Sequence, residues 1–115
     1  MILVSFIKDV QRLTLRVSGH AGYAAAGHDI VCSACSILTY TVAEVVASEK
    51  YALVTEPEIN LTEGFGTVSC EAIPARYAEM LRLYEVAMVG FAILAYNYPN
   101  HVNIQSFGEA EKPLI

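Results

Sequence analysis

Two segments at the start of the chain alternate apolar and polar residues. In residues 12–18, Leu13, Leu15 and Val17 alternate with polar side chains, and residues 1–7 are similarly rich in strand-forming residues. A period of two is typical of a strand that buries one face, and a short turn separates the two segments. We therefore predict an antiparallel pair of strands over residues 1–7 and 12–18.

Three further strands are predicted later in the chain. Residues 52–61 and 66–73 form a second pair joined by a turn at 62–64, and residues 101–107 supply a last strand. Proline cannot donate to a sheet ladder, so Pro57 places the 52–61 strand at an edge or at a bulge.

Two segments carry helical periodicity. The first helix is predicted from Asp29, a favourable N-cap, to about Ser48, and the second from after Pro74 to about Tyr96. Apolar residues recur at steps of three and four in both. In the first helix they are Val31, Cys35, Leu38, Val42 and Val45, and in the second Met80, Leu81, Tyr84, Met88, Phe91 and Ala95. The second half of the second helix is apolar almost all round, which predicts burial in the core or at an interface.

The element order is thus ββαββαβ. Two helices can cover one face of a mostly antiparallel sheet, so the predicted fold class is α+β, a two-layer sandwich. At 115 residues, without an internal linker or repeat, we expect one domain over 1–115, with 108–115 as a loose tail.

Composition narrows the choice of partners. The chain is 55 % hydrophobic, which suggests that part of its apolar surface is covered by a second copy in a homodimer. Its net charge of −5 argues against direct binding of nucleic acid, which needs a basic face. A basic segment followed by an apolar one is missing at the start, so we expect no export signal, no membrane and a cytoplasmic location. The three cysteines are interpreted as reduced thiols.

The residues best suited to catalysis or metal binding lie between Ser18 and Ser36. This segment includes two His, two Cys and one Asp. With Asp29 as N-cap, Cys32 is the third helical residue, where free N–H groups and the helix dipole favour a thiolate. His20 follows the second strand and could reach the helix start if the loop folds over. Such a pair can act as nucleophile and general base. We expect His28 to face solvent or the loop.

Two other interpretations use the same residues. Cys32 and Cys35 form a C-x-x-C pair that could be a redox dithiol, although Cys35 is expected to face the core. A zinc site could use His20, His28, Cys32 and Cys35, but the paired spacings of known zinc modules are missing. Elsewhere, His101 in the last strand is interpreted as a structural or exposed residue.

The blocks Gly19-His20-Ala21 and Gly27-His28-Asp29-Ile30-Val31-Cys32-Ser33-Ala34, followed by Ser36, resemble the ribosomal-processing cysteine protease family, Prp. The resemblance implies an endopeptidase with a Cys–His dyad, in which Cys32 is the nucleophile and His20 the general base. It also implies a substrate, the short N-terminal extension of bacterial large-subunit ribosomal protein number twenty-seven. Family members act as homodimers, and no cofactor or metal is implied. A second cysteine at position 35 departs from the family pattern.

The remaining motif residues are assigned supporting roles. Asp29 would cap the helix and order the site, Ser36 would support Cys32, and Gly19 would let the substrate backbone approach. The Cys32 N–H is expected to help bind the oxyanion. A lid over the substrate would be formed by Ala21, Gly22, Gly27 and His28. A non-catalytic ribosome-assembly binding module and a zinc or dithiol site stay open as alternatives.

Overall fold

The computed structural model describes residues 1–25 and 27–109. It contains five strands and two long helices, with short 3-10 turns at Lys50–Ala52 and Pro74–Arg76. In chain order the main elements are β1 (Ile2–Asp9), β2 (Arg12–Ser18), α1 (Ile30–Ser48), β3 (Glu58–Thr62), β4 (Phe65–Glu71), α2 (Tyr77–Asn97) and β5 (Val102–Glu109).

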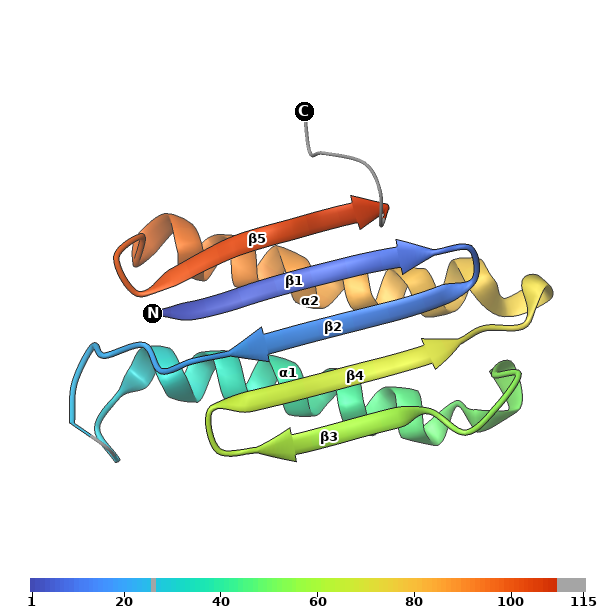
Figure 1. Ribbon diagram of the computed structural model, residues 1–115, viewed down its shortest axis with the longest axis horizontal. Coiled ribbons are helices and arrows are strands. Elements are labelled where there is room, and N and C mark those ends of the chain that lie inside the picture. Colours follow the sequence, from blue (N-terminus) through green and yellow to red (C-terminus); the bar gives the residue numbers. More distant parts are fainter. Residues whose placement is uncertain (26, 110–115) are drawn as a thin grey trace.

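The strands form one sheet in the order β3-β4-β2-β1-β5. All neighbours are antiparallel except β1 and β5, which run parallel. Helix α1 connects β2 to β3, and α2 connects β4 to β5, and both helices lie on the same face of the sheet (Figure 1). The predicted α+β two-layer fold and the order ββαββαβ are confirmed.

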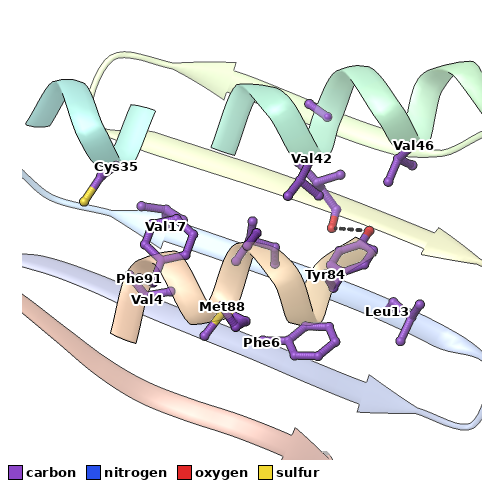
Figure 2. Packing of buried hydrophobic residues seen from close by; sticks show 14 of the residues in the cluster. Val4, Phe6, Leu13, Val17, Cys35, Val42, Val46, Tyr84, Met88 and Phe91 are labelled. Carbon is purple, nitrogen blue, oxygen red and sulfur yellow. Dashed lines mark hydrogen bonds between the residues drawn. The ribbon is translucent and has the colours of Figure 1, made fainter. Parts of the chain in front are cut away.

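The core lies between the sheet and the two helices. Alternate residues of β1, including Val4 and Phe6, point towards the helices and are fully buried. The ring of Phe6 stacks on that of Tyr84 from α2, with centroids 5.2 Å apart, and the Tyr84 hydroxyl donates to the carbonyl oxygen of Val68 at 3.1 Å (Figure 2). Burial raises the pKa of Tyr84 well above its ordinary value, so the hydroxyl stays protonated and remains a donor.

Several strand ends differ from the sequence prediction, and β1 and β4 end at Asp9 and Glu71 instead of at residues 7 and 73. The strand expected at 52–61 begins at Glu58, because the N–H groups of Ala52 and Leu53 donate to nearby carbonyls and close a 3-10 turn. Leu53 forms only an isolated bridge with Ala72. The edge position expected from Pro57 is confirmed, since β3 is the outer strand. At the other end of the chain β5 continues to Glu109, so 108–109 are strand, and the rest of the predicted tail lies outside the described residues.

The helices start and end close to the predicted positions, but their buried faces differ in part. In α1 the buried face includes Thr39, Ala43 and Val46, whereas Leu38 and Val45 are only partly buried. Cys32, Ser36, Thr39 and Ala43 follow one another along one side of α1. This side is open at Cys32 and Ser36, near the start of the helix, and part of the core at Thr39 and Ala43. By length and composition α1 is the one helix of the described chain that could cross a membrane, and 33 % of that stretch is buried inside the fold.

Helix α2 keeps an apolar stripe on its outer side. The side chains of Val86, Val89, Ile93 and Tyr96 are all more than half exposed. Steps of three and four place these residues on one face of the helix. The second half of α2 was predicted to be buried almost all round. Within a single chain, only its inner side is buried.

Candidate active site

One end of the sheet brings together segments that are far apart in the sequence. Here β2 ends, α1 begins, β3 turns into β4, and β1 and β5 both begin (Figure 1). An open cleft of about 910 Å³ lies at this end. Among the predicted site residues, those that line it are Gly19, His20, Gly22, Gly27, Asp29, Cys32 and Ser36. The structure therefore gathers most of the predicted site, and Ala21 and His28 do not line this cleft.

Asp29 ties the start of α1 to the preceding loop. One carboxylate oxygen accepts from the backbone nitrogens of Val31 and Cys32 at 3.0 and 2.9 Å, and the other accepts from those of Tyr23 and Ala24 at 3.0 and 3.3 Å. The Cys32 N–H, assisted by the other three, lowers the pKa of Asp29 below its ordinary 3.8, although burial acts in the opposite direction. Asp29 is thus an ionised N-cap that also orders the loop, as expected from its place in the sequence.

Cys32 lies at the third position of α1, and its thiol is partly exposed in the cleft. Its sulfur accepts a hydrogen bond from the backbone nitrogen of Ala21 at 3.3 Å. The Cys32 N–H donates to Asp29 in this arrangement, so its part in binding an oxyanion stays a prediction. The donor that points at the Cys32 sulfur comes from the loop after β2.

His20 is exposed at the rim of the cleft, next to the β3–β4 turn. The backbone of the preceding Gly19 donates to the Gly64 carbonyl oxygen at 2.9 Å, and the His20 carbonyl oxygen accepts from the Met1 nitrogen at 2.6 Å. Within the described residues no hydrogen bond joins the imidazole to the Cys32 thiol. Both groups line one cleft, and such bonds are often formed only when substrate is present.

Gly19 is required by the fold itself. Its φ of +97° is in the left-handed region, and a Cβ at this position would collide with the carbonyl oxygen of Met1. The backbone next to the open Cβ position of Gly19 is that of Met1 and Ile2, where β1 begins. This contact fixes where His20 leaves the sheet.

Ala21 is held in place from the far end of the chain. It is only 2 % exposed, and its carbonyl oxygen lies 2.8 Å from Nδ1 of His101. The ring of Tyr23 packs edge-on against the rings of both His101 and Tyr98. Sequence reasoning missed His101, because eighty residues separate it from Ala21 and no local pattern connects them.

The other predicted lid residues lie at the surface. Gly22, Gly27 and His28 are exposed, and the His28 nitrogen donates to the Ala25 carbonyl oxygen. A closing movement of this loop stays a prediction. Ser36 is exposed one turn after Cys32 and lines the same cleft.

Cys35 is in a different environment from Cys32. Its side chain lies on the inner side of α1 and is 2 % exposed (Figure 2). Burial, with smaller contributions from Cys32 and Asp29, raises its pKa to about 12. All three cysteines are free, and no three His, Cys, Asp or Glu side chains within the described ranges are placed to hold a metal ion. The four ligands considered for zinc are thus not brought together, and Cys35 is a core residue.

Comparison with known proteins gives matches of two kinds. The family model described as cysteine protease Prp matches residues 1–103. In fold, the chain is similar to SMU.848 from Streptococcus mutans, with 24 % identity and a TM-score of 0.66 over 94 % of this chain and 95 % of that one. No match was found among curated proteins.

It is also similar to the essential ribosomal processing protease Prp from S. aureus. Its structure in complex with a covalently linked product peptide matches this chain with 20 % identity and a TM-score of 0.71. Its structure in complex with a substrate peptide matches with 19 % identity and a TM-score of 0.66. Each match covers 93 % of this chain and 100 % of the other. At such low sequence identities, the similarity to these structures establishes only the fold. The family model matches nearly the whole sequence and therefore establishes the family. The chain belongs to the cysteine protease Prp family of peptidases.

Proposed function

We propose that this peptidase is an endopeptidase in which Cys32 is the nucleophile and His20 the general base. One observation carries the proposal. The Cys32 sulfur lies at the start of α1, accepts the Ala21 N–H at 3.3 Å, and opens into a cleft that His20 also lines. The other cysteines, Cys35 and Cys70, are buried and have raised pKa values, so neither competes as a nucleophile.

The reaction follows from these groups. His20 removes the thiol proton, and the sulfur attacks the carbonyl carbon of the scissile peptide bond to form a tetrahedral intermediate. When the C–N bond breaks, the imidazolium gives its proton to the leaving amine, and a thioester remains on Cys32. Water, deprotonated by His20, then attacks the thioester and releases the acid and the free thiol.

As substrate we propose the short, apolar N-terminal extension of bacterial large-subunit ribosomal protein number twenty-seven. The cleft is lined by apolar side chains beyond the reacting pair, among them Ile37 and Tyr40 of α1 and Leu61 and Phe65 around the β3–β4 turn. Such a lining suits an apolar peptide segment. The net charge of −5 favours a basic ribosomal protein over a nucleic acid.

We further propose that the enzyme acts as a homodimer in the cytoplasm, without a cofactor or a membrane. The exposed stripe of Val86, Val89, Ile93 and Tyr96 on α2 supports the dimer, because one apolar face of a helix is more stable when covered.

The test is cleavage of a peptide that spans the ribosomal extension, followed by mass spectrometry. We expect a single cut by the wild type and none by Cys32→Ala or His20→Ala, with both variants still folded. A Cys32→Ala variant that still cuts the peptide would contradict the proposed nucleophile. An intact peptide bound equally by wild type and variant would favour the binding-module alternative.

A further inference from the structure

The backbone around Ala21 is held at three separate points. The His20 carbonyl oxygen accepts from Met1, the Ala21 nitrogen donates to Cys32 Sγ, and the Ala21 carbonyl oxygen meets His101 Nδ1. Two consecutive peptide groups are therefore fixed between β1, α1 and the start of β5. The side chain of Ala21 is buried as well, so this short segment cannot shift without disturbing the core.

In the hydrogen bond between His101 and Ala21, the donor and the acceptor can be assigned. A carbonyl oxygen only accepts, so Nδ1 of His101 carries the hydrogen and donates it. The backbone of His101 is itself anchored, because its nitrogen donates to Tyr98 and its oxygen accepts from Ile2. The half-buried ring also packs edge-on against Tyr23, with centroids 5.4 Å apart. His101 is thus a rigid donor that reaches the loop from the sheet.

We propose that His101 is a positioning residue of the peptidase, which holds the Ala21 carbonyl so that the Ala21 N–H stays directed at the Cys32 sulfur. This inference rests on the proposed role of Cys32 as nucleophile. A hydrogen bond to a charged acceptor is stronger than one to a neutral acceptor, so this N–H stabilises the thiolate that attacks the peptide. His101 contacts the loop and does not line the cleft, so its loss should slow the chemical step and leave peptide binding nearly unchanged.

Three substitutions separate the effect of the donor from that of the bulk of the ring. His101→Phe keeps a ring for Tyr23 but has no donor. His101→Asn places an amide N–H near the position of Nδ1, whereas His101→Gln places it near Nε2, which does not reach Ala21. The other titratable groups near the sulfur or lining its cleft are unchanged in every variant, and they are His20, Asp29, Cys35, Tyr40 and Glu63.

The measurements are kcat and KM on the extension peptide, together with the rate at which iodoacetamide alkylates the protein at pH 7 and at a pH where exposed thiols are fully ionised. For His101→Phe and His101→Gln we expect kcat to fall about tenfold, the equivalent of one hydrogen bond of ~1.4 kcal/mol, with KM within about twofold. Alkylation should slow at pH 7 and not at the higher pH. His101→Asn should stay within about threefold of the wild type. Cys32→Ser serves as the control for which thiol is alkylated.

Each possible result either supports or overturns the proposed role of His101. If Cys32→Ser cleaves the peptide, the proposed function fails and this inference fails with it. If Cys32→Ser is inactive while His101→Phe matches the wild type, only the role of His101 is overturned. Equal losses of kcat in the His101→Asn and His101→Gln variants would also overturn the role of His101, as would a change confined to KM. The Asn and Gln comparison remains decisive even where His101→Phe does not fold.

Discussion

The imidazole of His20 lies against the backbone of Gly64, and a Cβ at residue 64 would come within 2.9 Å of Nε2 and 3.3 Å of Cε1. The β3–β4 turn is therefore a wall of the cleft and limits where His20 can point. Gly64 also has a φ of +76°, a conformation that other residues rarely adopt.

Gly64→Ala should therefore act in two ways. The left-handed backbone destabilises the fold by about 1 kcal/mol, and the new methyl group displaces the His20 ring and lowers kcat. Urea unfolding of Gly64→Ala, His20→Ala and the double variant separates the two effects, because the collision exists only when both side chains are present. Additive losses in the double variant would show that His20 does not rest on this turn.

The loop should respond to pH through Asp29. The pKa of this residue is lowered below 3.8 in the folded chain, so its carboxylate stabilises the fold above the unfolded pKa, and the stabilisation is lost as pH falls through the folded pKa. Asp29→Asn keeps one oxygen for the N–H groups of Val31 and Cys32 but offers no acceptor to Tyr23 and Ala24. We expect it to be less stable than the wild type at pH 7.

Unfolding in urea between pH 2.5 and 7 measures this effect. The difference in stability between the wild type and Asp29→Asn should begin to shrink as pH falls below the unfolded pKa of aspartate, about 3.9, and should vanish only below the lowered pKa of Asp29 in the folded chain. A difference in stability that is constant with pH would exclude an ionised Asp29 as its source.

Cys35 should be dispensable for catalysis. Its thiol is buried and its pKa is raised to about 12, so it stays protonated at neutral pH. We expect Cys35→Ser or Cys35→Ala to retain peptidase activity within about threefold, with ~1 kcal/mol lost from stability for the alanine variant. Peptide turnover and thermal unfolding test this. Loss of turnover as complete as in Cys32→Ala would reverse the roles of the two cysteines.

The Tyr84 hydroxyl should contribute to stability and not to activity. It donates to Val68 in the core, so Tyr84→Phe should lower the free energy of unfolding by about 1 kcal/mol. Tyr51 is 86 % exposed and offers a matched control, since Tyr51→Phe removes the same atom where water can replace it. Similar losses in both variants would show that the buried hydrogen bond contributes little. Turnover should be unchanged in each.

The outer stripe of α2 gives a test of the proposed dimer. Ile93 lies in the middle of this stripe and is 56 % exposed. A charge placed within a buried apolar interface is strongly unfavourable, so Ile93→Glu should shift the enzyme from dimer to monomer in sedimentation velocity. Glu44→Lys, on the exposed side of α1, is a control for a surface charge change. A wild type that sediments as a monomer would contradict the dimer itself.

The local elements were predictable because their signals are local. The alternation around Leu13 and the capping aspartate at residue 29 fixed the start of a strand pair and of a helix within one or two residues. The residues before Glu58 could not be assigned correctly, because a run of apolar residues there forms a 3-10 turn and a single bridge. Periodicity does not distinguish these from a strand.

The residues of the site motif could be predicted from the sequence, but the residues that surround them in the fold could not. Asp29 and Cys32 lie three residues apart, so helical geometry alone relates them. The contacts of Gly64 with His20, and of His101 with Ala21, depend on which strands become neighbours. In particular, nothing in the local pattern around residue 102 indicates that β5 pairs in parallel with β1.

That parallel pairing has a consequence for how the enzyme matures. A chain in synthesis exposes His20 and Cys32 long before residue 101, yet the donor for Ala21 arrives only when β5 has reached β1. The last strand thus completes both the sheet and the set of hydrogen bonds around Ala21. A nascent chain that still lacks this strand would carry His20 and Cys32 with the Ala21 carbonyl unheld, and by the proposed role of His101 its turnover would be about tenfold lower than that of the complete fold.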